Sequence, residues 1–267
     1  MNNTFKSFQL ACDVISWVID NRNIENPIDA RYNSKRTSRR FFETLYDKYK
    51  INFSYNFWLE SFKKYPDIIE SIKNYISTWK IEKNLPKLWL WNHQAFWLEA
   101  LWAYDYFPID WKIVLKDELL TPPLFWAWIK SIDPIVYYRW EINAEDRRNA
   151  AIKTTILEKN AVLIYPEWTR SKDWRIRWFD YKKYKAWYDI ITNLANEVNS
   201  QVAIITSDTF DALPNTLEES LVFMWDLNSW NITFTIDIID ASLYENIREF
   251  NNDVKNILET NLKKNLY

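Results

Sequence analysis

The sequence of 267 residues contains no glycine, one cysteine and one histidine. An average composition would give about 19 glycines in a chain of this length. Glycine is the residue that adopts positive φ at little cost, so its absence removes the usual residue for tight turns. The single Cys12 excludes an internal disulfide framework and a cysteine-rich metal site. Any imidazole chemistry contributed by this chain depends on His93 alone.

Long apolar runs are also missing, which excludes a membrane span by the usual length criterion. The best candidate, residues 120–138, is interrupted by three prolines and by Lys130 and Asp133. The segment 1–20 lacks the basic start and clean apolar run of a signal peptide. The net charge of −2 gives no indication of nucleic-acid binding. We therefore expect a cytoplasmic protein, in solution or on a membrane surface.

Tryptophan is present 17 times, about as often as glycine is expected. Trp111, Trp174 and Trp230 each follow Asp or Ser between apolar runs, where Asp-Gly and Ser-Gly hairpin turns are common. Tryptophan has no special tolerance for the left-handed region. We therefore hypothesise that most of the tryptophans are glycines in the cell, encoded by a UGA codon that some lineages read as glycine. The alternative is a genuinely tryptophan-rich protein whose aromatic side chains bind sugars, peptides or a membrane interface.

Residues 1–80 are predicted to form helices, as an N-terminal helical segment or bundle, with breaks around 21–34 and at Pro66. Apolar residues recur there at spacings of three and four, with charged residues between them. The pattern is clearest in four segments: 5–20, 38–50, 57–65 and 67–78.

From about residue 86 the pattern changes to strands alternating with helices. Strands are predicted at 87–91, 111–119, 134–139, 161–166 and 201–207, and a hairpin joins 221–227 to 231–239. Helices are predicted at 143–160, where Asn143 is a candidate cap and Asp146 lies in the first turn, and at 185–199 and 243–265. This alternation predicts an α/β domain over 81–267, with a mixed, largely parallel sheet flanked by helices.

His93 directly follows the first predicted strand of this domain, and Glu99 comes six residues later. A neutral imidazole with a pKa near 6.5 can accept a proton from a hydroxyl, and a carboxylate can orient it. The sequence also allows a plainer interpretation, in which a loop histidine bonds only to backbone groups.

A second polar segment, Glu167-Trp168-Thr169-Arg170, follows the predicted strand 161–166. With glycine at 168, the turn would present backbone N–H groups, and the arginine fork would match a phosphate. Lys116 and Arg139, each at the end of another predicted strand, could add positive charge to such a site. A solvated turn and ordinary surface cations are the alternatives.

Together these segments resemble the glycerolipid acyltransferase superfamily, the 1-acylglycerol-3-phosphate acyltransferases and their relatives. "NHQAFWLE" is similar to the first block, "KDELLTPPLFWAW" with "IVYYRW" to the second, "YPEWTRS" to the third, and "QVAIITS" takes the place of the fourth. The blocks occur in the family's order over about residues 85–240. Three of the family's glycines fall on Trp126, Trp140 and Trp168.

Two features depart from the family pattern. The acid of the first block is usually Asp, five positions after His, whereas here Glu99 stands at six. The fourth block usually contains a proline and here has none. The first departure leaves open a catalytically degenerate homologue that binds lipid without turnover.

The resemblance implies that His93 is the general base for an acceptor hydroxyl and that Glu99 orients it. The residues implied to hold the acceptor phosphate are Lys116, Arg139, Glu167, Trp168 (as Gly), Thr169 and Arg170. The acyl donor would be acyl-CoA or acyl carrier protein, and no metal or bound cofactor is needed. The acceptor would be glycerol-3-phosphate or a lysophospholipid such as lysophosphatidate, and the protein would sit peripherally on the inner face of the cell membrane, without nucleic-acid partners.

Overall fold

A computed structural model describes residues 52–78, 84–92, 111–120, 133–166, 181–195, 197–207 and 231–264, with isolated positions at 16, 26, 29, 33, 36, 40, 43, 47 and 176. The isolated positions up to 47 are helical, apart from Asn26. The catalytic His93 and Glu99 predicted from the sequence, and the segment Glu167–Arg170, lie outside the described residues, as do Trp126, Trp174 and Trp230.

The described strands form one mixed sheet in the order β1-β7-β6-β2-β5-β3-β4. The strands are β1 (Asn52–Phe57), β2 (Leu88–Trp91), β3 (Lys112–Lys116), β4 (Ile135–Tyr137), β5 (Val162–Ile164), β6 (Gln201–Ser207) and β7 (Asn231–Asp240). Every neighbouring pair is parallel except β6 and β7. The predicted fold class, a largely parallel α/β sheet, is confirmed.

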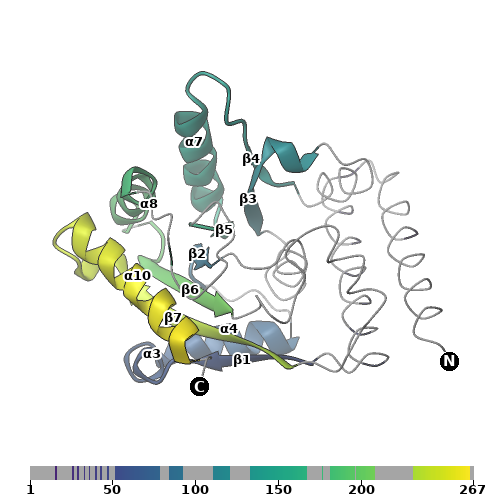
Figure 1. Cartoon of the computed structure of the whole chain (residues 1–267), viewed down its shortest axis with the longest axis vertical. Coiled ribbons are helices and arrows are strands. Elements are labelled where there is room, and N and C mark those ends of the chain that lie inside the picture. The colour runs from purple at the N-terminus through teal and green to yellow at the C-terminus, as the bar shows by residue number, and fades with distance from the viewer. Residues whose placement is uncertain are drawn as a thin grey trace.

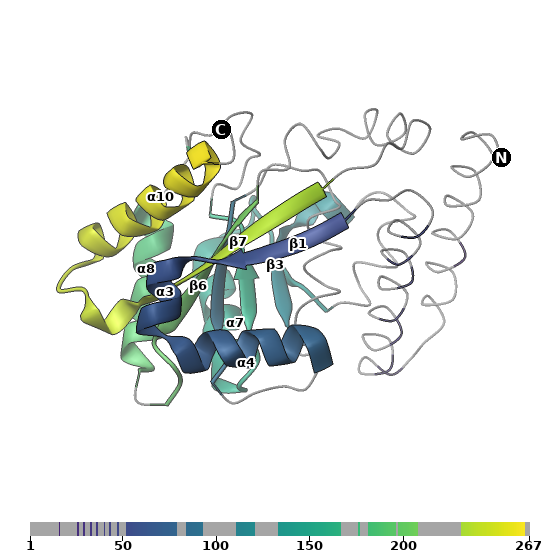
Figure 2. The same cartoon turned by 90° about the horizontal axis from the view of Figure 1, so that it is seen from below.

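Helices cover both faces of this sheet (Figure 1). They are α3 (Leu59–Lys64), α4 (Pro66–Thr78), α7 (Ala144–Leu157), α8 (Tyr181–Asn193) and α10 (Ile247–Lys264), with short 3-10 turns η1 (Asp117–Leu120) and η2 (Ala241–Leu243). The side chains of α7, α8 and α10 share one apolar cluster with Leu88 and Leu90 of β2. The alternate β2 residues, Trp89 and Trp91, are buried outside that cluster, because successive side chains of a strand point to opposite faces of the sheet. β1 lies beside β7 at the other end of the sheet from β4 (Figure 2). Burial on both faces explains the continuous apolar runs of the central strands.

The segment 1–80, for which only helices were predicted, also contains a strand, so the prediction is wrong at residues 52–57. Residues 52–57 form β1, which pairs in parallel with β7 in the register Asn52↔Asn231 to Phe57↔Ile236. Where β1 ends, Ser61 of α3 continues the contact, because its hydroxyl accepts a hydrogen bond of 2.9 Å from the Ile238 N–H. This contact covers part of an otherwise open strand edge. The predicted helices at 57–65 and 67–78 are confirmed as α3 and α4. The boundary between two domains near residue 80 stays a prediction.

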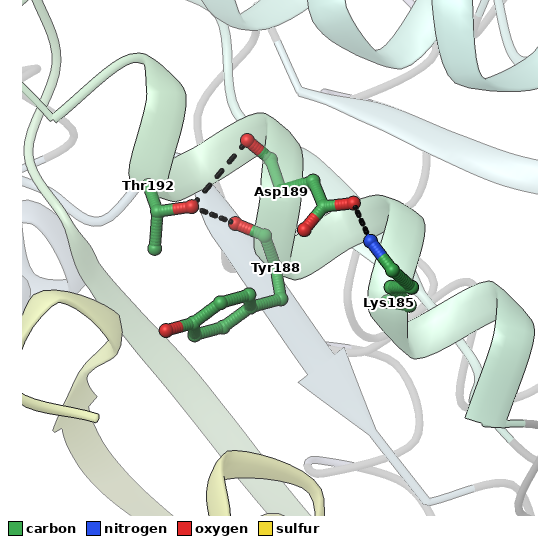
Figure 3. Close-up of polar contacts among 4 residues, drawn as sticks. All are labelled: Lys185, Tyr188, Asp189 and Thr192. Atoms are coloured by element: carbon green, nitrogen blue, oxygen red, sulfur yellow. Dashed lines mark hydrogen bonds and ion pairs between the residues drawn. The ribbon is translucent and has the colours of Figure 1, made fainter. Parts of the chain in front are cut away.

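Helix α8 shows how the outer helices divide their polar and apolar sides (Figure 3). Lys185 and Asp189 form an ion pair one turn apart, and both are about half exposed. The ring of Tyr188 points away from this pair and packs on Phe250 of α10, while its hydroxyl donates to the Tyr244 carbonyl at 2.8 Å. Burial is the main reason why the pKa of Tyr188 is raised above its ordinary value. The predicted helix at 185–199 is present, but it runs from Tyr181 to Asn193.

The described backbone places positive φ at Asp133, Asn143 and Lys159 and at no tryptophan. Asn143 occupies the N-cap position of α7 in the left-handed region, and its side chain makes no capping hydrogen bond, so the predicted cap lacks that interaction. Trp111 is buried directly before β3 and packs edge-to-face on Trp89. The turn suggested at Asp110–Trp111 includes residues outside the described part of the chain, and Trp111 itself has no positive φ.

No helix in the described part of the chain has both the length and the apolar content that a membrane span requires.

Candidate functional site

The carboxyl ends of five described strands lie along one edge of the sheet. β6, β2, β5, β3 and β4 are consecutive in the sheet and mutually parallel, so their carboxyl ends point the same way. Functional groups of open α/β sheets gather at this edge. All the polar segments singled out in the sequence follow one of these strands, apart from the fourth block, which is β6 itself.

The end of β2 is held firmly against the end of β6. Asn92, the residue after β2, is fully buried, and its Nδ2 donates to the Ser207 carbonyl at 2.8 Å. The Ser207 N–H donates in turn to Asn92 Oδ1 at 2.7 Å. Trp91 Nε1 donates to the Ser207 hydroxyl at 2.8 Å. His93 is the next residue along the chain, so it follows directly on a residue that these hydrogen bonds hold in place.

The end of β5 lies beside that of β2. Leu90 of β2 is paired with Ile164 of β5 in the parallel ladder. His93 and Glu167 each come three residues after these paired positions, so the two predicted site segments leave neighbouring strands at the same register. The ring of Tyr165, directly after β5, lies 5.8 Å from that of Trp91. The topology thus places side by side the two strands that precede these segments, which lie far apart in the sequence.

The ends of β3 and β4 add positive charge to this edge. Lys116 is the last residue of β3 and is paired with Tyr137, the last residue of β4; Arg139 follows two residues later. Arg139 forms an ion pair of 3.5 Å with Glu118 of η1, and both side chains are more than a third exposed. The structure therefore brings the predicted Lys116 and Arg139 together. It also shows that Glu118 offsets part of the charge of Arg139.

Lys183, near the start of α8, is a cation that the sequence analysis missed. Burial is the main reason why the pKa of Lys116 is lowered from its ordinary value, and the nearby charges of Arg139 and Lys183 lower it further, while Glu118 raises it. Lysines repel one another at short range, so a cluster of them is costly unless an anion is bound there. The run "YKKYK" marks three lysines at this helix start, and only the fold shows which of them approaches Lys116.

Ligands for a metal ion are not grouped in the described part of the chain. No set of three or more His, Cys, Asp or Glu residues lies close enough there to hold one.

Comparisons with solved structures find similar folds, whereas comparisons of the sequence find no match. No protein-family profile matches the sequence, and no curated protein sequence matches it either. Among solved structures, the fold is similar to that of the 1-acyl-sn-glycerophosphate (LPA) acyltransferase PlsC from Thermotoga maritima, with a TM-score of 0.62. The two chains are 13% identical, and the match covers 98% of this chain and 94% of the other. At this identity the likeness shows a shared fold.

Proposed function

We propose that this chain is an O-acyltransferase that moves a fatty acyl group from a thioester to a hydroxyl of a glycerophosphate-type acceptor. The observation that supports the proposal is that the described strands leading into the four sequence segments are neighbours in one sheet and that four of them have their carboxyl ends at one edge. These segments match the acyltransferase blocks in order, and the fold that unites them is similar to that of a solved acyltransferase. The motif resemblance and the fold together support the proposal better than either does by itself, because one fold can host many functions.

The proposed mechanism has His93 as general base. Its imidazole takes the proton of the acceptor hydroxyl as the hydroxyl oxygen attacks the thioester carbonyl carbon. Glu99 orients the ring and stabilises its charged form. The tetrahedral intermediate then collapses, and the thiol of coenzyme A or of acyl carrier protein leaves. No bound metal or cofactor takes part in the proposed reaction.

The proposed acceptor carries a phosphate group, because the site edge is rich in cations. Arg170 supplies a planar fork for two phosphate oxygens, and Lys116, Arg139 and Lys183 supply further charge. Glu167, Trp168 and Thr169 complete the segment that would enclose the phosphate. Lysophosphatidate and glycerol-3-phosphate both fit this description. An acceptor or product with long acyl chains implies work at a membrane surface, so we propose peripheral attachment to the inner face of the cell membrane.

Replacement of the single histidine tests the proposal directly. His93→Ala should reduce thioester-dependent acylation of lysophosphatidate by at least about 100-fold, because it removes the only imidazole. Far-UV circular dichroism should be unchanged. An unaltered rate in this variant would contradict the assigned role of His93. If the wild-type chain binds lysophospholipid but releases no thiol with any acceptor, the degenerate lipid-binding alternative is correct.

Arg170→Ala tests the acceptor site separately. We expect the KM for a phosphorylated acceptor to rise, with little change in the KM for acyl-CoA, because the guanidinium is assigned to phosphate. Initial rates at varied concentrations of each substrate measure the two constants. A change confined to the acyl-donor KM would show that Arg170 belongs to the donor site.

A further inference from the structure

We propose that Asn92 is a positioning residue that holds the chain at the point where His93 leaves the sheet. This inference rests on the proposed function for its kinetic consequence, but its structural basis is independent of that function. The amide of Asn92 is fully buried and makes two hydrogen bonds to the backbone of Ser207, with donor–acceptor distances of 2.8 and 2.7 Å.

These two bonds supply the kind of partners that a regular step of the parallel ladder would give to the backbone of Ser207. The ladder between β2 and β6 runs to the pair Trp91↔Ile205, and the Asn92 N–H still bonds to the Ile205 carbonyl at 3.3 Å. In a regular continuation, the Ser207 N–H would bond to the Asn92 carbonyl, and the Ser207 carbonyl would accept from the N–H of residue 94. The side-chain amide of Asn92 supplies an acceptor for the Ser207 N–H and a donor for the Ser207 carbonyl.

The consequence is that the chain can leave the sheet directly after Asn92. Ser207 is fully buried, and its backbone groups would be costly to leave without partners. Because the side chain of Asn92 satisfies them, neither group depends on a backbone partner beyond Asn92. Asparagine is suited to this task, since its amide carries one acceptor and donors in the same geometry as a peptide group. Alanine has neither, and an ionised aspartate has acceptors only.

The two hydrogen bonds between Asn92 and Ser207 would fix the position of the backbone directly before His93, the proposed general base. General base catalysis requires the imidazole within hydrogen-bond reach of the acceptor hydroxyl, and a displacement of about 1 Å can reduce the rate about 100-fold. Asn92 contacts neither substrate in this scheme, so it acts through the position of His93.

Asn261 of α10 provides a matched control. It is also a buried asparagine, and its Nδ2 donates to Asp237 at 2.6 Å and to the Thr206 hydroxyl at 3.3 Å. Thr206 directly precedes Ser207 in β6. The two asparagines are therefore comparable in burial and hydrogen bonding, but only Asn92 adjoins the histidine.

The kinetic experiment compares Asn92→Ala, Asn92→Asp and Asn261→Ala with the wild-type chain. Asn92→Ala should lower kcat about 100-fold while both KM values stay within about twofold. Asn92→Asp, which keeps the acceptor for the Ser207 N–H, should fall between Asn92→Ala and the wild type, and it serves if Asn92→Ala does not fold. Asn261→Ala should lower the melting temperature and leave kcat near the wild-type value.

The second readout is the imidazole itself. An untagged chain has one histidine, so a ¹H–¹⁵N spectrum of the ring nitrogens reports His93 alone. Asn92→Ala should shift or broaden these signals and alter their pH titration, whereas Asn261→Ala should not. Unchanged imidazole signals and an unchanged kcat in the Asn92 variants would overturn the inference. If the wild type proves to have no acyltransferase activity, the proposed function fails, and the imidazole spectra still decide the role of Asn92.

Discussion

At the scale of single residues, the unusual feature is a lysine held partly buried among other cations. Lys116 ends β3, and its neighbours Arg139 and Lys183 repel its positive charge. Burial lowers its pKa most, and Glu118 opposes this effect. Perturbed pKa values are common at functional sites, which fits the role proposed for Lys116 in binding the acceptor phosphate.

The lowered pKa of Lys116 predicts how acceptor binding responds to alkaline pH. Below that pKa the ammonium is charged and binds the phosphate; as pH rises through it, the charge is lost. We expect the KM for lysophosphatidate to rise at a lower pH than the ordinary lysine pKa of 10.5 would give. In Lys116→Arg this alkaline rise should disappear, because a guanidinium stays charged throughout. Initial rates measured from neutral pH upward provide the test.

Removing the charge of Lys116 altogether should weaken the same step. Lys116→Met should raise the KM for lysophosphatidate about tenfold, which corresponds to about 1.4 kcal/mol. Lys153→Met, which removes an exposed lysine from α7, is the control and should leave this constant unchanged. Equal effects of the two substitutions would mean that only the net charge of the protein matters.

At the scale of elements, the carboxylate of Asp240 links the end of β7 to the start of β6 by hydrogen bonds. Asp240 ends β7, and its Oδ1 accepts from the Ser242 N–H at 3.0 Å and from the Ser200 hydroxyl at 2.7 Å. Its Oδ2 accepts from Gln201 Nε2 at 2.7 Å. Burial alone would raise the pKa of Asp240, but the hydrogen bonds from Ser242, Ser200 and Gln201 outweigh burial and lower it.

Asp240→Asn should destabilise the fold by about 1 kcal/mol at neutral pH, because it removes a charged cap. The folded-state pKa lies below the unfolded value, so the contribution is fully present above the unfolded pKa and is lost as pH falls through the folded one. The difference between variant and wild type should therefore shrink in acid. Chemical denaturation near pH 7 and near pH 3 measures it, with exposed Glu245→Gln as the control. A difference that is constant with pH would contradict the role of the carboxylate charge.

At the scale of the whole molecule, the identity of the tryptophans bears on the packing. Trp89, Trp91, Trp111 and Trp187 are among the largest fully buried side chains described. Trp89 Nε1 donates to the Pro86 carbonyl at 2.8 Å, and Trp91 Nε1 to Ser207. Trp140, in contrast, is 82% exposed in the turn between β4 and α7. Indoles at the buried positions fill the core, whereas the indole at Trp140 contributes little to it.

The recoding hypothesis predicts that most of the tryptophan positions carry glycine in protein purified from the cells that make it. Peptide mapping by mass spectrometry should then show glycine at 126, 140 and 168, and the absorbance at 280 nm should be far below that of a chain with 17 tryptophans. Indole at all three positions would contradict the hypothesis. Indole at Trp89 and Trp91 is what the observed core packing requires, since loss of a buried tryptophan costs about 3–5 kcal/mol. A peptide map that covers every tryptophan position shows which of them carry glycine and which carry tryptophan.

The sequence alone determined the α/β class and most strands and helices, because hydrophobic periodicity and the alternation of elements are local properties of the chain. It also identified Lys116 and Arg139 as candidate cations, since each ends an apolar run. It did not predict β1, because "NFSYNF" gains its strand conformation from pairing with β7, which lies near the other end of the sequence.

Only the tertiary structure decided which of these segments meet. The strand order places β2 between β5 and β6, which joins Asn92 to Ser207 and aligns the exits toward His93 and Glu167. It also brings Lys183 of α8 toward Lys116 at the end of β3. The reason is physical: sequence periodicity reports which side of an element is buried, whereas pairing across a sheet and packing between layers depend on residues far apart in the chain.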